Sequence, residues 1–98
     1  MPTYVALLNW TDQGVRAYKD TPKRAEAFAA ATRNVGANLL NIYWTFGPYD
    51  VVAIVEAPDD ETAAAALLQL GGAGNVRTTT LRAFGQDEME RIIGKTAG

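Results

Sequence analysis

The chain has 98 residues, of which 48% are hydrophobic and 20% are charged, and this balance predicts a single folded domain over residues 1–98. Its net charge of -2 at pH 7 argues against nucleic acid or an anionic membrane as a partner. Cysteine and histidine are absent, which excludes disulfides, thiolate nucleophiles, imidazole bases and the usual zinc and haem ligands, so neither a metal nor a tightly held cofactor is expected.

The start of the chain predicts a strand followed by little helix. Residues 3–10 are rich in β-branched and aromatic side chains and end at a polar segment, as strands do. In the segment 11–20, Thr11 or Asp12 can cap a helix, but Gly14 weakens one. At most two helical turns are therefore expected there.

The next segment, residues 21–36, carries the firmest helix signal. Thr21 can cap the helix, Pro22 suits the first helical position, and Gly36 follows as a stop. Residues at helical spacing form one stripe, which predicts the buried side of this helix: Ala25, Phe28, Ala29, Thr32 and Val35.

The middle of the chain predicts a β-hairpin and a second helix. Two strand-like runs, 38–46 and 50–57, are separated by a Gly-Pro-Tyr turn at 47–49. The acids at 59–61 then stand where a helix N-terminus favours negative charge, and an Ala/Leu-rich helix is expected to end at Gly71. We interpret these acids as helix caps rather than metal ligands, because consecutive acids diverge around a helix axis.

A threonine-rich strand over 75–84 and a short amphipathic tail over 86–95 complete the chain, and the tail is expected to pack on another surface. The order β-α-β-β-α-β predicts an α+β fold of the ferredoxin-like type, a four-stranded antiparallel sheet with two helices on one face. The first and third strands lie inside such a sheet, and their segments VALL and VVAIV are accordingly apolar on both faces.

Side chains alternate along a strand, so the hairpin divides into two sets if Phe46 pairs with Val51. The wholly apolar set is expected to face the helices: Leu40, Ile42, Trp44 and Phe46 with Val51, Ala53 and Val55. The mixed set is expected on the other face: Asn41, Tyr43, Thr45, Asp50, Val52, Ile54 and Glu56. A one-residue slip in the pairing would exchange the two sets.

A mixed face without helices needs another cover, and a second copy of the chain can supply it. Two sheets packed face to face form a dimeric α/β barrel, as a homodimer or within a higher oligomer. Such a barrel has room between its sheets for a small, largely apolar ligand.

Four segments together resemble the GYD domain family, which is named for a Gly-Tyr-Asp motif: NWTDQG (9–14), KDTPKR (19–24), GPYDVVAIVEAPDDE (47–61) and GNVRTTTLRAF (74–84). The sequence departs from the name-giving motif, because Pro48 stands between Gly47 and Tyr49. The resemblance implies a ferredoxin-like domain of the dimeric barrel type, in a family without an established biochemical role. It carries over no catalytic residue.

Tyr43, Asp50 and Glu56 are the candidate acid-base groups. Asp50 can act in catalysis or can simply accept backbone hydrogen bonds in the turn. Glu56 lies in an apolar strand, where burial suits a carboxyl group to proton transfer, but we favour a pairing with Arg77 or Arg82. These two arginines are expected on opposite faces of the sheet, because their spacing is odd.

The candidate ligand-binding residues are Asn9, Trp10, Asn41, Tyr43, Thr45, Asp50 and Arg77. Asn41 and Tyr43 can orient a polar ligand group, although the Tyr43 ring can equally pack in an interface. Asn9 and Trp10 end the first strand, where a capping amide beside a packed ring is the plainer interpretation. Arg77 can bind an anion or can be the charge that keeps an edge strand from aggregating.

The leading hypothesis is a homodimer whose paired sheets bind a small apolar molecule. A cytoplasmic location is expected, because the sequence lacks a signal-peptide pattern and an apolar run long enough for a membrane span. One alternative is a cofactor-independent enzyme, a monooxygenase, isomerase or cyclase that uses Tyr43, Asp50 or Glu56. Another is an oligomeric interaction module without any ligand.

Overall fold

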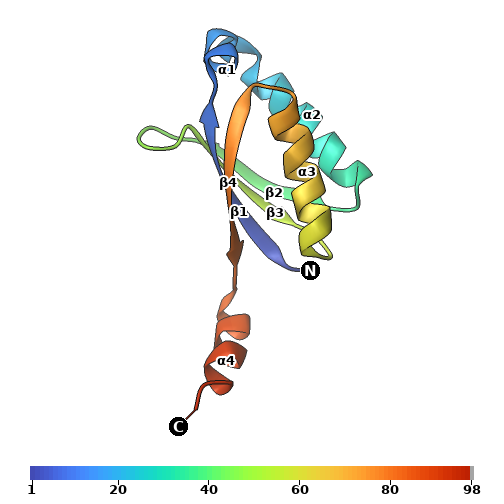
Figure 1. The fold of residues 1–98 in the computed structure, drawn as a ribbon, viewed down its shortest axis with the longest axis vertical. Coiled ribbons are helices and arrows are strands. Elements are labelled where there is room, and N and C mark those ends of the chain that lie inside the picture. The colour runs from blue at the N-terminus through green and yellow to red at the C-terminus, as the bar shows by residue number, and fades with distance from the viewer. Residues whose placement is uncertain (98) are drawn as a thin grey trace.

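The computed structural model describes residues 1–97 and has an α+β fold with one antiparallel sheet (Figure 1). Its strands are β1 (Thr3–Trp10), β2 (Asn38–Trp44), β3 (Val51–Glu56) and β4 (Val76–Ala83). Its helices are α1 (Asp12–Arg16), the 3₁₀ turn η1 (Tyr18–Asp20), α2 (Thr21–Asn34), α3 (Asp60–Gly72) and α4 (Gln86–Gly94). Helices α2 and α3 lie side by side on one face of the sheet.

The strands are ordered β2-β3-β1-β4, and every neighbouring pair is antiparallel. The α+β class and the four-stranded antiparallel sheet are thereby confirmed, and the order is compatible with the ferredoxin-like arrangement. The first and third strands are the inner ones, as their apolar segments indicate. Both edges of the sheet are formed by strands that mix threonine, asparagine and arginine with apolar residues.

The helices begin largely where the sequence predicts, with one correction. At the start of α3, the Asp59 carboxylate accepts a hydrogen bond from the Thr62 N–H at 2.8 Å. Pro22 lies in the first turn of α2, but the predicted cap at Thr21 is wrong, because Thr21 is already helical and Asp20 holds the cap position. The Thr21 hydroxyl instead accepts a hydrogen bond from the Trp44 indole at 3.0 Å.

The core lies between the helices and one face of the sheet. On the inner strands every second side chain is buried: Tyr4, Ala6 and Leu8 on β1, and Val51, Ala53 and Val55 on β3. From α2, Phe28 and Thr32 of the predicted stripe reach this core. Full burial of an aliphatic side chain such as Val55 contributes about 1.5–3 kcal/mol to folding. Thr32 satisfies its hydroxyl by donating to the Phe28 carbonyl at 2.6 Å.

The hairpin register differs from the predicted one by two residues. Trp44, rather than Phe46, lies opposite Val51. An even shift preserves the side on which a residue lies, so Ile42 is correctly placed on the helix side. The predictions for Leu40 and Phe46 are wrong: Leu40 is the extra residue of a β-bulge, and Phe46 lies fully exposed in the turn beyond the strand.

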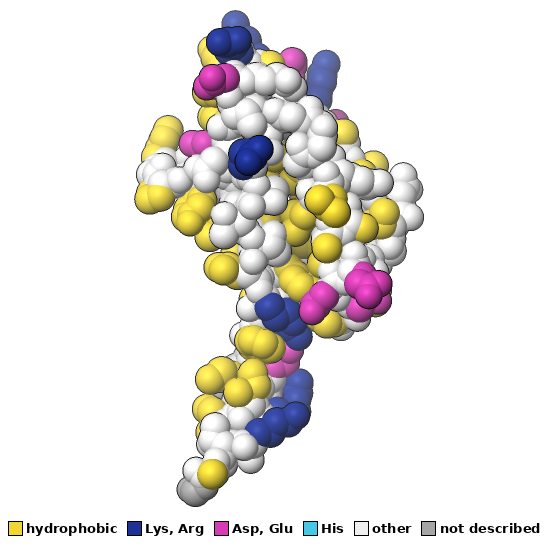
Figure 2. Space-filling view, viewed as in Figure 1, with side chains coloured by type: hydrophobic (Ala, Val, Ile, Leu, Met, Phe, Trp, Pro, Cys, Tyr) yellow, Lys and Arg dark blue, Asp and Glu magenta, His cyan; other side chains and the backbone are white. Residues whose placement is uncertain are grey.

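Helix α4 projects away from the rest of the molecule instead of packing on its own sheet (Figure 1). Hydrophobic side chains gather along one side of it and basic side chains along the other (Figure 2). Met89 and Ile93 are consequently about half exposed. The predicted amphipathic tail forms a helix. Because no surface of its own chain covers its apolar side within residues 1–97, its packing on another surface stays a prediction. Over the same residues, no helix combines the length and the apolar character needed to cross a bilayer.

Candidate functional site

The face of the sheet opposite α2 and α3 is the first candidate site, and we call it the open face. It receives the side chains that alternate with the buried ones on β1 and β3, with their neighbours on the two edge strands. Its members are Thr3, Val5, Leu7, Asn9, Asn38, Asn41, Tyr43, Val52, Ile54, Glu56, Arg77, Thr79, Leu81 and Ala83. The centre of the open face is aliphatic, and its polar groups lie toward the edges.

Asn41 and Tyr43 lie on edge strand β2 and are both exposed. Within residues 1–97, neither side chain makes a hydrogen bond to another residue. Tyr43 lies opposite Val52, so its ring borders the aliphatic centre of the open face. The two residues therefore offer an amide and a phenol to whatever covers this face.

The side chains of Asp50, Thr45 and Asn9 make hydrogen bonds that stabilise the hairpin turn. The Trp10 N–H donates to the Asp50 carboxylate at 2.9 Å, and the Asn9 amide donates to the Pro48 carbonyl at 2.7 Å. The Thr45 hydroxyl donates to the Tyr49 carbonyl at 2.6 Å. These contacts are the turn chemistry that stands as the alternative to catalysis for Asp50.

Glu56 does not pair with either arginine. Its carboxylate accepts a hydrogen bond from the Asn38 amide at 3.2 Å, so the favoured pairing with Arg77 or Arg82 is wrong. The two arginines do lie on opposite faces, because Arg77 is opposite Asn9 and Arg82 is opposite the buried Tyr4.

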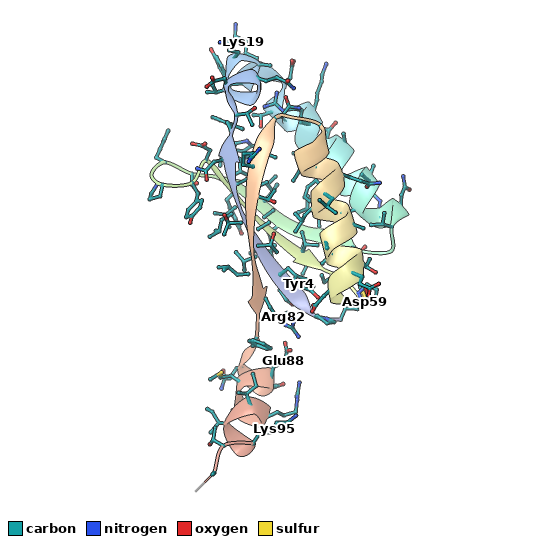
Figure 3. All side chains as sticks on the ribbon, viewed as in Figure 1. Tyr4, Lys19, Asp59, Arg82, Glu88 and Lys95 are labelled. Atoms are coloured by element: carbon teal, nitrogen blue, oxygen red, sulfur yellow. The ribbon has the colours of Figure 1, made fainter. Side chains whose placement is uncertain are left out.

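Arg82 lies on the helix side of β4 between aromatic and acidic partners (Figure 3). Its guanidinium binds the Glu88 carboxylate at 3.1 Å and lies over the rings of Phe84 and Tyr4 at 4.5 and 5.7 Å. Beside it, the Tyr4 hydroxyl donates to the Asp60 carboxylate, and this hydrogen bond raises the pKa of Tyr4. The cluster joins β1, β4, α3 and α4, and its groups are occupied with one another.

The candidate acids do not meet within one chain. Asp50 directly precedes β3 and Glu56 ends it, six residues further on. At about 3.3 Å per residue, the two carboxylates lie roughly 20 Å apart along the strand. A single substrate group cannot touch both of them.

A second candidate site is a pocket of about 330 Å³ on the helix side of the sheet, which we call the helix-side pocket. It lies at one end of the molecule, and its lining is mostly apolar. Trp10 is the only predicted ligand-binding residue that lines it. The other lining residues that matter below come from α2, β2 and the segment between α3 and β4: Arg24, Phe28, Ala31, Trp44 and Asn75. Sequence reasoning missed this pocket, although a tryptophan at the end of each of two strands was a signal.

Together the fold and the open face define a class: a small α+β domain with one bare face on an antiparallel sheet and no metal-binding residue cluster within residues 1–97. More narrowly, the chain belongs to the GYD domain family, whose model matches residues 4–93. The resemblance of the four segments quoted above is thereby confirmed over nearly the whole chain.

Three known proteins are similar to this chain. The glutamine synthetase and cystathionine beta-lyase binding protein of Thermus thermophilus is 39% identical over 85 residues, which are 86% of this chain and 90% of that protein. The crystal structure of TTHA0845 from the same organism matches with a TM-score of 0.57 and 28% identity, over 87% of this chain and 95% of that one. MtbAldR matches with a TM-score of 0.60 at 15% identity, over 87% of this chain and 52% of its own, which shows a shared fold.

Proposed function

We propose that this protein is a homodimeric binding module that associates with metabolic enzymes. Two copies cover each other's open face, and the dimer presents its remaining surface to the enzyme. The observation that carries the self-association is the aliphatic centre of the open face, which no helix of the chain covers within residues 1–97.

The composition of the open face supports a protein interface. Val5, Leu7, Val52 and Ile54 project from the two inner strands, and Leu81 adds a half-exposed side chain from β4. Contiguous apolar patches of this kind on a small domain are commonly covered by a partner. In a two-fold dimer, each subunit covers the apolar patch of the other with its own copy of the same patch, so no second surface is needed.

The enzyme-binding part of the proposal is supported by the Thermus relative, whose name states that it binds glutamine synthetase and cystathionine beta-lyase. The similarity covers most of both chains, so no additional domain of the relative is needed to account for its binding. A cytoplasmic location, where such enzymes work, is part of the same proposal.

The self-association is tested by a pair of leucine variants. Leu81→Glu places a carboxylate on the open face, whereas Leu68→Glu places it on the exposed outer side of α3. An unpaired charge buried in an interface costs about 3 kcal/mol or more, so Leu81→Glu is expected to weaken the dimer at least about 100-fold. Leu68→Glu is expected to leave the mass measured by light scattering unchanged. Equal masses for the two variants would contradict the open face as the dimer interface.

Enzyme binding is tested with purified glutamine synthetase and cystathionine beta-lyase from the protein's own host. Immobilised wild-type protein is expected to bind at least one of them reversibly in biolayer interferometry. Serum albumin and an unrelated lyase serve as negative controls. If neither enzyme binds at micromolar concentration, the enzyme-binding proposal is wrong even when the dimer is present.

A second candidate function is the binding of a small apolar molecule between the paired sheets. It is favoured by Asn41, Tyr43 and Arg77, which border the aliphatic centre without making side-chain hydrogen bonds within residues 1–97. Native mass spectrometry of protein purified from its host is expected to show a dimer with a retained molecule. A dimer of bare protein mass favours the interaction module without a ligand.

The cofactor-independent enzyme has less support. The Asp50 carboxylate is engaged by the Trp10 N–H, and Glu56 is bound to Asn38 at the far end of the strand. Of the three candidate acid-base groups, Tyr43 alone is exposed and unengaged within residues 1–97, and a lone phenol is a weak acid-base catalyst near neutral pH. Any catalysis at the open face would depend on groups that a partner subunit brings to it.

A further inference from the structure

We propose that the helix-side pocket binds a small monocarboxylate with an apolar body, such as a short fatty acid or an arylalkanoic acid. The pocket lies on the opposite side of the sheet from the open face, so this binding does not depend on the dimer. The apolar part of the ligand lies between the helices and the sheet, and its carboxylate meets Arg24.

The size and lining of the pocket define the apolar part of the ligand. Its volume of about 330 Å³ is at the lower end of ligand pockets in proteins, which suits a molecule on the order of ten heavy atoms. Its sheet side is formed by Leu8, Ile42 and Val51, and its helix side by Phe28 and Leu70. Such surfaces favour a hydrocarbon or an aromatic ring over a sugar or a nucleotide.

Small side chains explain why this space is not filled by the protein itself. On α2, Ala25, Ala27 and Ala31 line the pocket where larger residues would fill it. On α3, Ala73 does the same just beyond the last turn. The two helices therefore leave an apolar space between them at this end of the sheet.

Arg24 supplies the charge that selects an acid. Its guanidinium donates from one terminal nitrogen to the Ala17 carbonyl at 2.8 Å and from the other to the Gly14 carbonyl at 3.1 Å. A guanidinium has five N–H donors, so these two bonds hold it in place and leave further donors for a carboxylate.

No carboxylate of the described residues neutralises Arg24. The salt bridge within residues 1–97 joins Arg82 and Glu88, at the other end of the molecule. Arg24 is the only charged residue that lines the pocket in this part of the chain, and the first turn of α2 contains no acid. An apolar pocket with one fixed, unpaired cation at its edge is complementary to an amphipathic anion.

The pocket also contains uncharged polar groups that can donate to a carboxylate. Asn75 and Gln69 line the pocket with side-chain amides. The Asn75 side-chain oxygen already accepts a hydrogen bond from Gln13 at 3.1 Å, which leaves its amide nitrogen as a donor. The pocket thus combines several N–H donors with a mostly apolar lining.

The tryptophans of the chain allow binding in the pocket to be measured directly. Its two tryptophans, Trp10 and Trp44, both line the pocket, so intrinsic tryptophan fluorescence and the indole N–H signals in NMR spectra report on this site. The probes are two matched pairs, octanoate against octanamide and 4-phenylbutyrate against 4-phenylbutanamide. Each pair keeps the apolar body and changes the charge.

We expect both acids to change the fluorescence saturably and to bind at least about tenfold more tightly than their amides, since a charge-assisted bidentate contact is lost with the charge. Arg24→Gln is expected to abolish that preference. Arg33→Gln, the same change in the last turn of α2 and away from the pocket, is expected to preserve it. Circular dichroism establishes that each variant is folded.

A pocket-filling variant tests the site without removing charge. Ala31→Leu is expected to reduce the affinity for both acids at least about tenfold while the protein stays folded, because the larger side chain occupies the pocket. Undiminished binding to Ala31→Leu would locate the ligand elsewhere and overturn the proposal. Equal affinity of wild-type protein for acid and amide, or no saturable change at millimolar acid, would overturn it without reference to any variant.

Discussion

The substitution Gly14→Ala tests how the pocket is held together. A Cβ at this position would lie 1.9 Å from the carbonyl oxygen of Asn75. This oxygen belongs to the backbone, so no side-chain rotation can relieve the clash. To reach ordinary contact at 3.4 Å, the two backbone segments must separate by about 1.5 Å. The same contact carries the hydrogen bond from the Thr11 N–H to the Asn75 carbonyl at 3.1 Å.

The cost of this separation can be worked out from the bonds it breaks. Losing that bond, together with the one from the Thr11 hydroxyl to the Gly74 carbonyl, costs about 1 kcal/mol each, and strain adds about 1 kcal/mol more. The better helix propensity of alanine offsets up to about 1 kcal/mol. The net loss is about 2 kcal/mol, or roughly 8–16 °C in the midpoint of thermal unfolding for a domain of this size.

The matched control is Gly71→Ala in α3, where an added Cβ meets nothing within 4 Å. There the propensity gain stands alone, and the protein is expected to be unchanged or up to about 1 kcal/mol more stable. Urea unfolding followed by circular dichroism measures both variants. If Gly14→Ala is as stable as wild type, the close packing of α1 against the segment before β4 is wrong, and so is the fixed position of Arg24.

Two further predictions concern acid sensitivity and the hairpin turn. Hydrogen bonds from Thr62, from its side chain first and then from its N–H, lower the pKa of Asp59, and the Gly85 N–H followed by Arg82 lowers the pKa of Glu88. Both contributions to stability are therefore complete above the ordinary carboxyl range and are lost as the pH falls through the lowered pKa values. Urea midpoints are expected to decrease between about pH 5 and 3, less steeply in Asp59→Asn, and an increase over that range would refute this. Deletion of Pro48 is expected to preserve the fold at a cost of about 1 kcal/mol, the loss of its hydrogen bond from Asn9, as NMR spectra of the strands can show. Failure of that variant to fold would show that the turn length determines the register.

The elements of the fold were predictable because their signals are local. Pro22 and Gly36 mark the two ends of α2, and the acids after Pro58 mark the start of α3. The burial of alternate residues on β3 follows directly from the apolar run VVAIV. Each of these signals depends on a few neighbouring residues, so the sequence carries them without knowledge of the tertiary structure.

Register and caps were less predictable, because they depend on contacts between distant segments. The β-bulge at Leu40 removes this side chain from the face that alternation predicts, and no glycine or proline in the strand signals the bulge. Thr21 looks like a cap, but the hydrogen bond from Trp44, 23 residues later, engages its hydroxyl within the helix. Phe46 looks like the end of a strand, but the turn begins one residue earlier, at Thr45.

One candidate site was predictable from local sequence signals and the other was not. Alternation along strands is sufficient to assign Asn41 and Tyr43 to the open face and to place Arg77 and Arg82 on opposite faces, and the registers agree. The helix-side pocket is different, because alanines on α2 form it only where α3 and the ends of two strands meet them. No periodicity of the sequence distinguishes an alanine that allows close packing from one that leaves a space.

The most direct test of the central claim is the mass of the unmodified protein in solution. Sedimentation equilibrium at micromolar concentration is expected to give twice the 10.5 kDa mass of the chain. A mass of one chain across that concentration range would contradict the account, because the open face would then have no second copy to cover it.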